Sequence, residues 1–448
     1  MSLDNISTNR RQAIKLAAGG AVIGGIGFAP ATHAVAQDSP KITWWLDVTG
    51  GAEGATCLIE GAIKDFNDLG GIQVETTLQP NGWTATQTAL AGGVGPDIVG
   101  TPGPSLALAL AKAGQVLDLT PYSTAMGWAD RFTPWALALG KVGDQLFAIP
   151  NEIETLVLYY NKTLFDANGW TPPTTIAELT ATAQAVSDAG LIPFAHSNAE
   201  WKGTNEWFVG EFLNHGAGPD KVYQALTGAL PWTDQAFVDA LTILNEYQQN
   251  DWFMGGLDRY YTTPSADATS ALAYGDAAMK IEGSWLISDM LLYFGESGQE
   301  WDWVPMPSTD GAEIYDIGIG STCSINANTT EADATAEFLS AMFSAEFQAK
   351  TVTHCGFPPA PITIPVEMLA DIDPRQARQI ERLNSASADG NYGYTTWTFW
   401  PPATETYLIE EIEKVWAGDV TVAEYLQGLH DSFTAELAAG NVPPIPVR

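Results

Sequence analysis

Two acidic residues in the segment FAIPNEIETLVLYYNK, residues 147–162, are spaced in a way that could support chemistry. Glu152 and Glu154 are two positions apart, so on a strand both side chains point to the same face, about 6.6 Å apart along the chain. That separation is close to the ~6.5–9.5 Å between the acid and the base of an inverting glycosidase. The pair therefore has three interpretations: a catalytic pair, a polar contact with a ligand, or the solvated end of a buried strand.

Other reactive motifs are absent from the sequence, and its charge excludes several partners. The five histidines are scattered, with no HExxH motif, no Cys/His spacing suited to zinc and no phosphate-binding glycine motif. We therefore expect no metal and no nucleotide cofactor. The net charge of −34 would repel nucleic acid and anionic lipid, and it disfavours a strongly anionic ligand.

The N-terminus has the parts of a secretory signal. Arg10 and Arg11 precede a weakly apolar, glycine-rich stretch at 16–31, and Ala34-Val35-Ala36 forms a small-x-small cleavage pattern. The arginine pair favours the twin-arginine route. An N-terminal membrane anchor is the alternative, but the apolar stretch is shorter than the ~20 residues of a spanning helix. We expect residues 1–36 to be a signal peptide and the mature protein to be soluble in the periplasm.

Three cysteines are too few for a disulfide framework, and three cannot all pair. In an oxidising compartment a bridge between Cys323 and Cys355 is one expectation. Buried free thiols are the alternative.

Short β-rich runs alternate with helical patterns along the mature chain. The order β-α-β-α-β at its start predicts an α/β lobe with a largely parallel sheet. Strands are expected at 41–48, 72–79, 96–101, 156–161 and 277–285, and helices at 57–69, 85–93 and 175–190. Capping boxes at Thr175/Glu178 and Thr421/Glu424 mark two helix starts.

Four segments resemble a known family in family order. They are GGVGPDIVGTPGPSLALALAKAGQVLDLTPY (92–122), the hinge strand with Tyr-Tyr-Asn-Lys (147–179), AAMKIEGSW (277–285) and GSTCSINANTTEADATAEFLSAMFSAEFQ (320–348). They are similar to the solute-binding proteins of carbohydrate ABC importers, the maltose-binding-protein-like family 1 of bacterial solute-binding proteins. The resemblance covers roughly residues 40–430.

The resemblance implies a two-lobed α/β periplasmic-binding-protein (Venus-flytrap) fold. Three interlobe crossings are then expected near 151–154, 314–318 and 355–360, so each lobe combines two pieces of sequence. The expected lobes are 37–152 with 314–355, and 153–313 with 356–448. The implied function is capture of a neutral mono- or oligosaccharide by a monomer, without catalysis, and delivery to ABC permease subunits in the inner membrane.

The predicted ligand contacts combine aromatic rings, which stack on sugar rings, with carboxylates, which bind hydroxyls. The resemblance and the residue types select Trp45, Asp47, Glu53, Thr101, Glu152, Glu154, Trp201, Trp285, Asp316, Trp397 and Trp400. Trp397 and Trp400 are alternatives for one stacking position, and Trp207 is expected in a helix core.

The sequence leaves two other functions open. An exported glycoside hydrolase could use Glu152 and Glu154, but both lie on one strand, whereas acid and base must approach opposite faces of the scissile bond. An anionic or polyol solute is the other alternative, and no Arg stands at any predicted contact.

Overall fold

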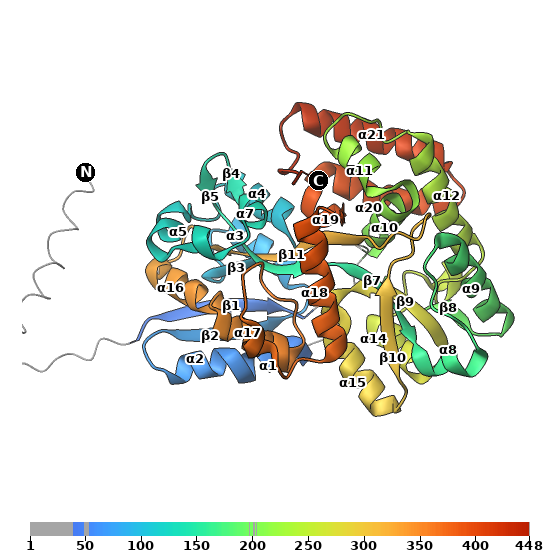
Figure 1. The fold of residues 1–448 in the computed structure, drawn as a ribbon. Coiled ribbons are helices and arrows are strands. Elements are labelled where there is room, and N and C mark those ends of the chain that lie inside the picture. The colour runs from blue at the N-terminus through green and yellow to red at the C-terminus, as the bar shows by residue number, and fades with distance from the viewer. Residues whose placement is uncertain (1–38, 49–52, 197, 200–201, 203, 448) are drawn as a thin grey trace, which may run out of the picture. The chain divides into compact units, whose positions relative to one another are not determined.

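The computed structural model describes residues 39–48, 53–196, 198–199, 202 and 204–447, which form two main β-sheets covered by helices (Figure 1). The predicted signal peptide (1–36) and Trp201 lie outside the described residues, so both stay predictions. Within the described ranges, every helix is too short or too polar to cross a membrane.

The first sheet has the strand order β12-β11-β3-β1-β2, and β6 pairs with β11. Its strands are β1 (Lys41–Asp47), β2 (Gln73–Gln79), β3 (Ile98–Thr101), β6 (Ile149–Glu154), β11 (Tyr315–Ile325) and β12 (Tyr392–Tyr394). Strand β1 is parallel to β2 and β3, as predicted, but β11 is antiparallel to β3 and β6. The sheet is therefore mixed rather than largely parallel, because a strand from late in the chain returns beside the early ones.

The second sheet has the order β10-β7-β9-β8. Its strands are β7 (Leu156–Asn161), β8 (Ile192–Phe194), β9 (Ala277–Gly283) and β10 (Trp301–Pro305). The central strands β7 and β9 are buried along their whole length. Continuous burial matches the apolar run of β7, whereas β9 carries two buried charged residues, Lys280 and Glu282, which pair with each other at 3.3 Å. A two-stranded hairpin, β4 (Lys141–Val142) with β5 (Gln145–Leu146), lies outside both sheets.

The three predicted helices are present, but two begin earlier than expected, at Glu53 rather than at 57 and at Gly82 rather than at 85. Both predicted capping boxes are present, at the starts of α9 and α21. The helix predicted at 57–69 is continuous but contains a π-helical turn at Ile59–Ile63 between α1 and α2. The helices before β9 are α1 (Glu53–Leu58), α2 (Lys64–Asp68), α3 (Gly82–Ala91), α4 (Pro104–Lys112), α5 (Thr120–Met126), α6 (Trp128–Arg131), α7 (Pro134–Ala138), α8 (Lys162–Asn168), α9 (Ile176–Asp188), α10 (Thr204–Ala217), α11 (Pro219–Leu226), α12 (Gln235–Gln249), α13 (Gly256–Arg259) and α14 (Ser265–Tyr274). Those after it are α15 (Ile287–Ser297), α16 (Ala332–Met342), α17 (Ala345–Cys355), α18 (Pro374–Asp389), α19 (Thr396–Phe399), α20 (Pro402–Trp416) and α21 (Val422–Ala438).

Each sheet has its own hydrophobic core. The core around the first sheet draws on residues 42–149 and 323–360, and the core around the second on residues 136–319 and 383–433. Strand β11 contributes to both, because Ile317 and Ile319 pack in one core and Cys323 and Ile325 in the other. Its pairing with β6 shifts register between Ile319 and Ser321. The lobe boundaries given above stay a prediction.

One disulfide joins Cys57 in α1 to Cys355 at the end of α17, with a Cα–Cα distance of 5.7 Å. The predicted Cys323–Cys355 bridge is therefore wrong. Cys323 is a buried free thiol on β11, where its side chain faces the core.

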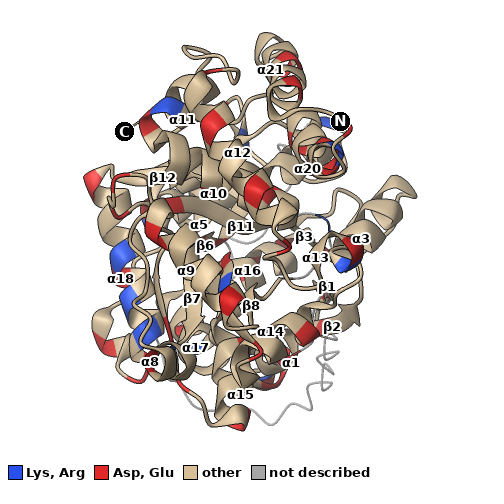
Figure 2. Cartoon of the chain, turned by 90° about the vertical axis from the view of Figure 1, so that its right-hand side faces the viewer, with Lys and Arg blue, Asp and Glu red and all other residues tan. Residues whose placement is uncertain are grey.

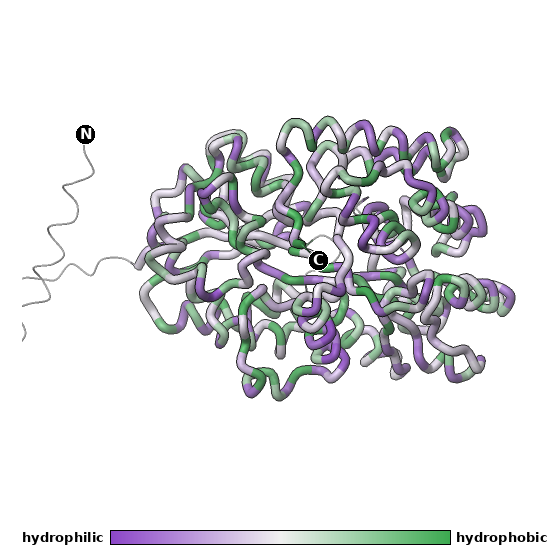
Figure 3. The backbone as a smooth tube through the Cα atoms, turned by 45° about the horizontal axis from the view of Figure 1, so that its top comes forward, coloured by the Kyte–Doolittle hydropathy of each residue, from purple (hydrophilic) through white to green (hydrophobic). Residues whose placement is uncertain are grey.

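The acidic surface is visible on the outer helices, where red residues far outnumber blue ones (Figure 2). Helix α18 is an exception, with Arg375 and Arg378 over the rings of Trp301 and Trp303. Along the outer helices hydrophobic and hydrophilic residues alternate (Figure 3), as expected for helices that cover a sheet with one face.

Candidate functional site

A cavity of about 620 Å³ is lined by elements from both cores. On one side its walls come from β1, α1 and α3, and on the other from β9, α10 and α15. Strands β6 and β11 also line it, near the shift in their pairing register. The carboxyl end of β1 opens into this cavity, which is where ligands bind on α/β sheets.

Three tryptophans form an aromatic wall of the cavity. Trp285, in the turn after β9, lies 5.1 Å from Trp207 and 6.0 Å from Trp397, measured between ring centroids. Its ring folds back over Gly283, where a Cβ atom would overlap it. The buried rings of Trp207 and Trp397 are inclined by 57° and 74° to that of Trp285, so the half-buried Trp285 is the ring that can stack on a flat apolar ligand surface.

Glu152 and Glu154 both line the cavity from β6. Their carboxyl groups hydrogen-bond to one another. Burial raises the pKa of Glu152, and it raises the pKa of Glu154 further, helped by the Glu152 charge. Asn151 donates to Glu152 and also to Ser321 of β11. Two touching carboxyls can share a proton and grip hydroxyls, but they leave no room for a glycosidic bond between them.

Gly320 on β11 makes the room that Glu154 needs. A Cβ atom at this position would overlap the Glu154 carboxyl group, well inside the 3.0 Å limit of real Cβ contacts. The backbone of β11 therefore packs directly against that carboxyl. The orientation of Glu154 therefore depends on a glycine in the neighbouring strand β11.

Further carboxylates surround the cavity. Asp47 accepts from the backbone N–H of Trp83 at the start of α3, at 3.3 Å, so part of its charge caps a helix. Glu53 is the first residue of α1. Burial raises the pKa of Asp289 to about 6, and the negative charges of Glu53 and Glu282 add to this effect. Among the described residues that line the cavity, none is Lys, Arg or His.

The predicted contacts divide into three groups. Those that line the cavity are Trp45, Asp47, Glu53, Glu152, Glu154, Trp285 and Trp397. Those that do not line it are Thr101, Asp316 and Trp400. Trp201 is not among the described residues. The ligand contacts themselves stay predictions.

The three residues outside the cavity have other packing partners. Thr101 is buried and hydrogen-bonds to Thr322 at 2.6 Å. The ring of Trp400 is buried 4.3 Å from that of Trp232. Asp316, at the start of β11, is buried beside α10 rather than at the cavity.

Several residues that line the cavity are not among the contacts predicted from the sequence. The principal ones are Trp83, Asn151, Asn198, Trp207, Glu282 and Asp289. Trp207 reads as helix core because α10 is buried on all sides. Glu282 could have been predicted from the sequence, because it directly precedes the Gly-Ser-Trp turn that contains Trp285.

The comparisons with known proteins point in one direction. A family model described as bacterial extracellular solute-binding protein matches residues 61–365. The osmoprotective compounds-binding protein GgtB of Synechocystis sp. is 27% identical over 222 residues, which is 48% of this chain and 52% of that protein. The chain thus spans about half the length of this curated relative.

Solved structures share the fold over almost their whole length. A structure from work on xylan utilization by Caldanaerobius polysaccharolyticus has a TM-score of 0.75 at 21% identity, covering 87% of this chain and 99% of that one. The GacH receptor of Streptomyces glaucescens, solved without ligand and with acarbose, has a TM-score of 0.72 at 21% identity, covering 89% and 99%. This similarity shows that the α/β architecture is that of the solute receptors.

Proposed function

We propose that this protein, which belongs to the bacterial extracellular solute-binding proteins, captures a neutral sugar or short oligosaccharide and delivers it to the permease of an ABC importer. The observation that carries the proposal is one cavity that combines the wall of Trp207, Trp285 and Trp397 with the carboxyls of Glu152 and Glu154. Rings and carboxyls together match the apolar faces and the hydroxyls of a sugar.

The ligand would bind between the two cores and draw them together. Strands β6 and β11 contribute side chains to both cores, so a change in their pairing near Ile319 and Ser321 would move one core against the other. A ligand that contacts both sides of the cavity favours the closed form by its extra contacts there. The permease would then recognise the closed form, outside the cytoplasm and in the periplasm if residues 1–36 direct export.

Binding without catalysis accounts for the arrangement better than hydrolysis does. The hydrogen bond between Glu152 and Glu154 brings the two carboxyls too close to serve opposite faces of a scissile bond. A second candidate ligand class is osmoprotective compounds, because the relative from Synechocystis sp. carries that description. Small polyols therefore belong in the same ligand screen as the sugars.

The test is a thermal-shift screen of neutral mono- and oligosaccharides, polyols and sugar phosphates. Hits would be measured by calorimetry, and the ligand recovered afterwards by chromatography. We expect intact ligand and a Kd of about 1 µM or tighter, which corresponds to about −8 kcal/mol. Released monosaccharide would refute the binding function, and stabilisation by sugar phosphates alone would refute a neutral ligand.

A matched pair of tryptophan variants places the ligand. Trp285→Ala should remove the thermal shift if the sugar stacks on the aromatic wall. Trp170→Ala, beside Phe165 and away from the cavity, should keep it. An unchanged affinity in Trp285→Ala would mean that the ligand binds elsewhere.

A further inference from the structure

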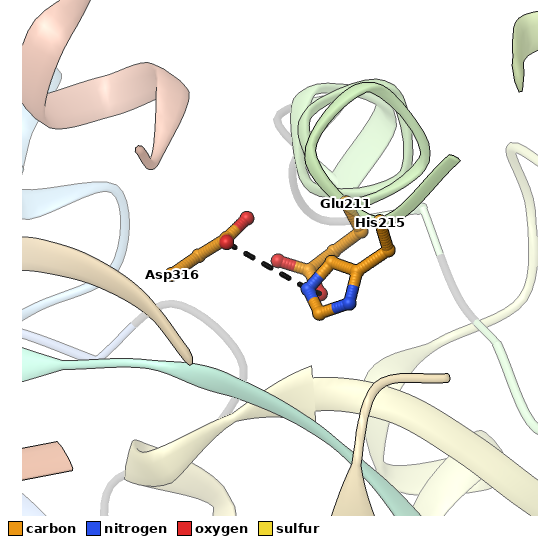
Figure 4. A group of neighbouring side chains, drawn as sticks. All are labelled: Glu211, His215 and Asp316. Carbon is orange, nitrogen blue, oxygen red and sulfur yellow. Dashed lines mark ion pairs between the residues drawn. The ribbon is translucent and has the colours of Figure 1, made fainter. Parts of the chain in front are cut away.

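A second cluster of chemically capable side chains lies outside the cavity. Glu211 and His215 are one helical turn apart on α10, and Asp316 faces them from the start of β11 (Figure 4). The three side chains are only 0–1% exposed. They point toward one another from two elements that are far apart in sequence, so the tertiary fold creates the cluster.

The distances within the cluster are those between ligands of one ion. Nε2 of His215 lies 3.4 Å from Oε2 of Glu211 and 3.6 Å from Oδ1 of Asp316. The three donor atoms all lie within 4.8 Å of one another. Two ligands bound tetrahedrally at ~2.0–2.2 Å from a metal ion are themselves about 3.3–3.6 Å apart. The observed spacing is long for hydrogen bonds but suits atoms around a shared ion.

Two of these buried groups have donor atoms without a hydrogen bond. His215 has a backbone partner at Met306, and the Glu211 carboxyl has a partner in Asp316, but Nε2 of His215 and Oε2 of Glu211 make no hydrogen bond of ordinary geometry. Among the described residues, no Lys or Arg forms an ion pair with Glu211. A buried carboxylate is costly unless it is paired or coordinates a metal, so a cation between these side chains would compensate their burial.

The neighbouring strand leaves room for the Asp316 carboxyl. Gly393 of β12 is the register partner of Asp316, and a Cβ atom on Gly393 would overlap Oδ1 of Asp316. This is the same oxygen that faces His215. A side chain at position 393 would push Asp316 out of the cluster.

We propose that Glu211, His215 and Asp316 form a binding site for a divalent transition-metal ion that fixes helix α10 to strand β11. One imidazole nitrogen and two carboxylate oxygens suit Zn²⁺, Mn²⁺, Fe²⁺ or Co²⁺. Ca²⁺ is disfavoured because it takes six to eight oxygen ligands. The expectation from the sequence that the protein binds no metal would then be wrong, because no linear motif brings these residues together.

The position of this site gives the ion a structural role near the sugar cavity. Trp207 and Thr204 line the cavity from the first turn of α10, and Ser321 and Thr322 line it from β11. An ion bound to both elements would hold these cavity walls at a fixed distance. The metal site does not depend on the identity of the ligand in the cavity.

The test uses the full chain, stripped of metal in denaturant and refolded with Zn²⁺, Mn²⁺ or Co²⁺, or with none. After removal of free ions, we expect about one equivalent of metal per chain and a higher Tm than in the metal-free sample. Co²⁺ should also give a visible absorption band from an N/O site. Less than about 0.1 equivalent of every metal, with an unchanged Tm, would overturn the proposal and favour a proton shared by the carboxyls.

Variants locate the ion. Glu211→Gln and His215→Gln should each lose the metal and the Co²⁺ band, whereas His354→Gln, at an exposed position on α17, should keep both. Metal that survives in the first two variants but disappears in the third would be surface-bound, and the proposal would fall. Should the first two variants fail to fold, the stoichiometry and Co²⁺ spectrum of the unmodified chain still decide.

Discussion

The substitution Gly320→Ala tests whether Glu154 holds the ligand. In the structure the three atoms nearest to a Cβ at position 320 all belong to the Glu154 carboxyl group, and the Cβ would overlap them. That group is the end of a flexible side chain, so it can rotate away while the backbones of β6 and β11 keep their pairing. We therefore expect a folded protein in which one carboxyl has left its place in the cavity.

The expected loss of binding free energy in Gly320→Ala follows from the hydrogen bond that the ligand loses. A ligand hydroxyl left without its partner in a closed cavity costs about 1–3 kcal/mol. Since 1.4 kcal/mol is a factor of ten in affinity, the Kd should rise about 5- to 150-fold. If Gly320→Ala weakens binding by displacing Glu154, then Glu154→Gln should weaken binding by a similar factor. The double variant should bind about as weakly as either single variant.

The assay is calorimetric titration with the tightest sugar from the ligand screen, with circular dichroism to establish folding. Gly295→Ala is the matched control, because Gly295 is exposed on α15 and a Cβ there meets nothing within 4 Å. It should bind normally and gain about 1 kcal/mol of helix stability. Unchanged affinity in Gly320→Ala, or full additivity with Glu154→Gln, would refute the reasoning.

Three further predictions concern the cavity and the disulfide. Trp285→Phe should bind the sugar more weakly than the unmodified chain but more tightly than Trp285→Ala, by calorimetry, because a smaller ring still stacks; equal loss in both would contradict stacking. Folding raises the pKa of Asp289 to about 6, so between its ordinary pKa near 4 and pH 6 the folded state holds a proton that the unfolded chain has released. The free energy of unfolding should therefore fall as pH rises through this window, by up to about 3 kcal/mol from this group, and urea titrations at pH 4 and 7 should show a smaller fall in Asp289→Asn. The double substitution Cys57→Ser and Cys355→Ser should lower the free energy of unfolding, measured in urea, by about 2–4 kcal/mol. Thiol titration of the unmodified, denatured chain should find one free thiol, from Cys323. Three free thiols would contradict the disulfide.

Local signals were sufficient for many elements of the fold. The capping boxes at Thr175 and Thr421 predict helix starts that the structure confirms, because a cap is satisfied within three residues. The β-rich run at 41–48 predicts strand β1 to within one residue, and the structure shows burial alternating along it. The mixed character of the first sheet was not predictable in this way, because the direction of β11 relative to β3 depends on the whole intervening chain.

For the site, the resemblance and the residue types together select some residues that line the cavity and others that do not. Trp397 and Trp400 are three positions apart in one aromatic run, yet only Trp397 lines the cavity, while Trp400 packs on Trp232. Asp316 was expected at the sugar and lies instead beside His215. In each case the missing information was the position of a partner far away in the sequence.

By itself the sequence determined the family, the α/β class and the presence of acids and tryptophans suited to a sugar, because these follow from motifs and composition. Only the tertiary structure decided which side chains meet. Cys355 bonds to Cys57 rather than Cys323, Glu154 depends on Gly320, and Asp316 joins α10. The physical reason is that each of these contacts spans more than 90 residues, and such contacts are set by how strands and helices pack rather than by their neighbours in the chain.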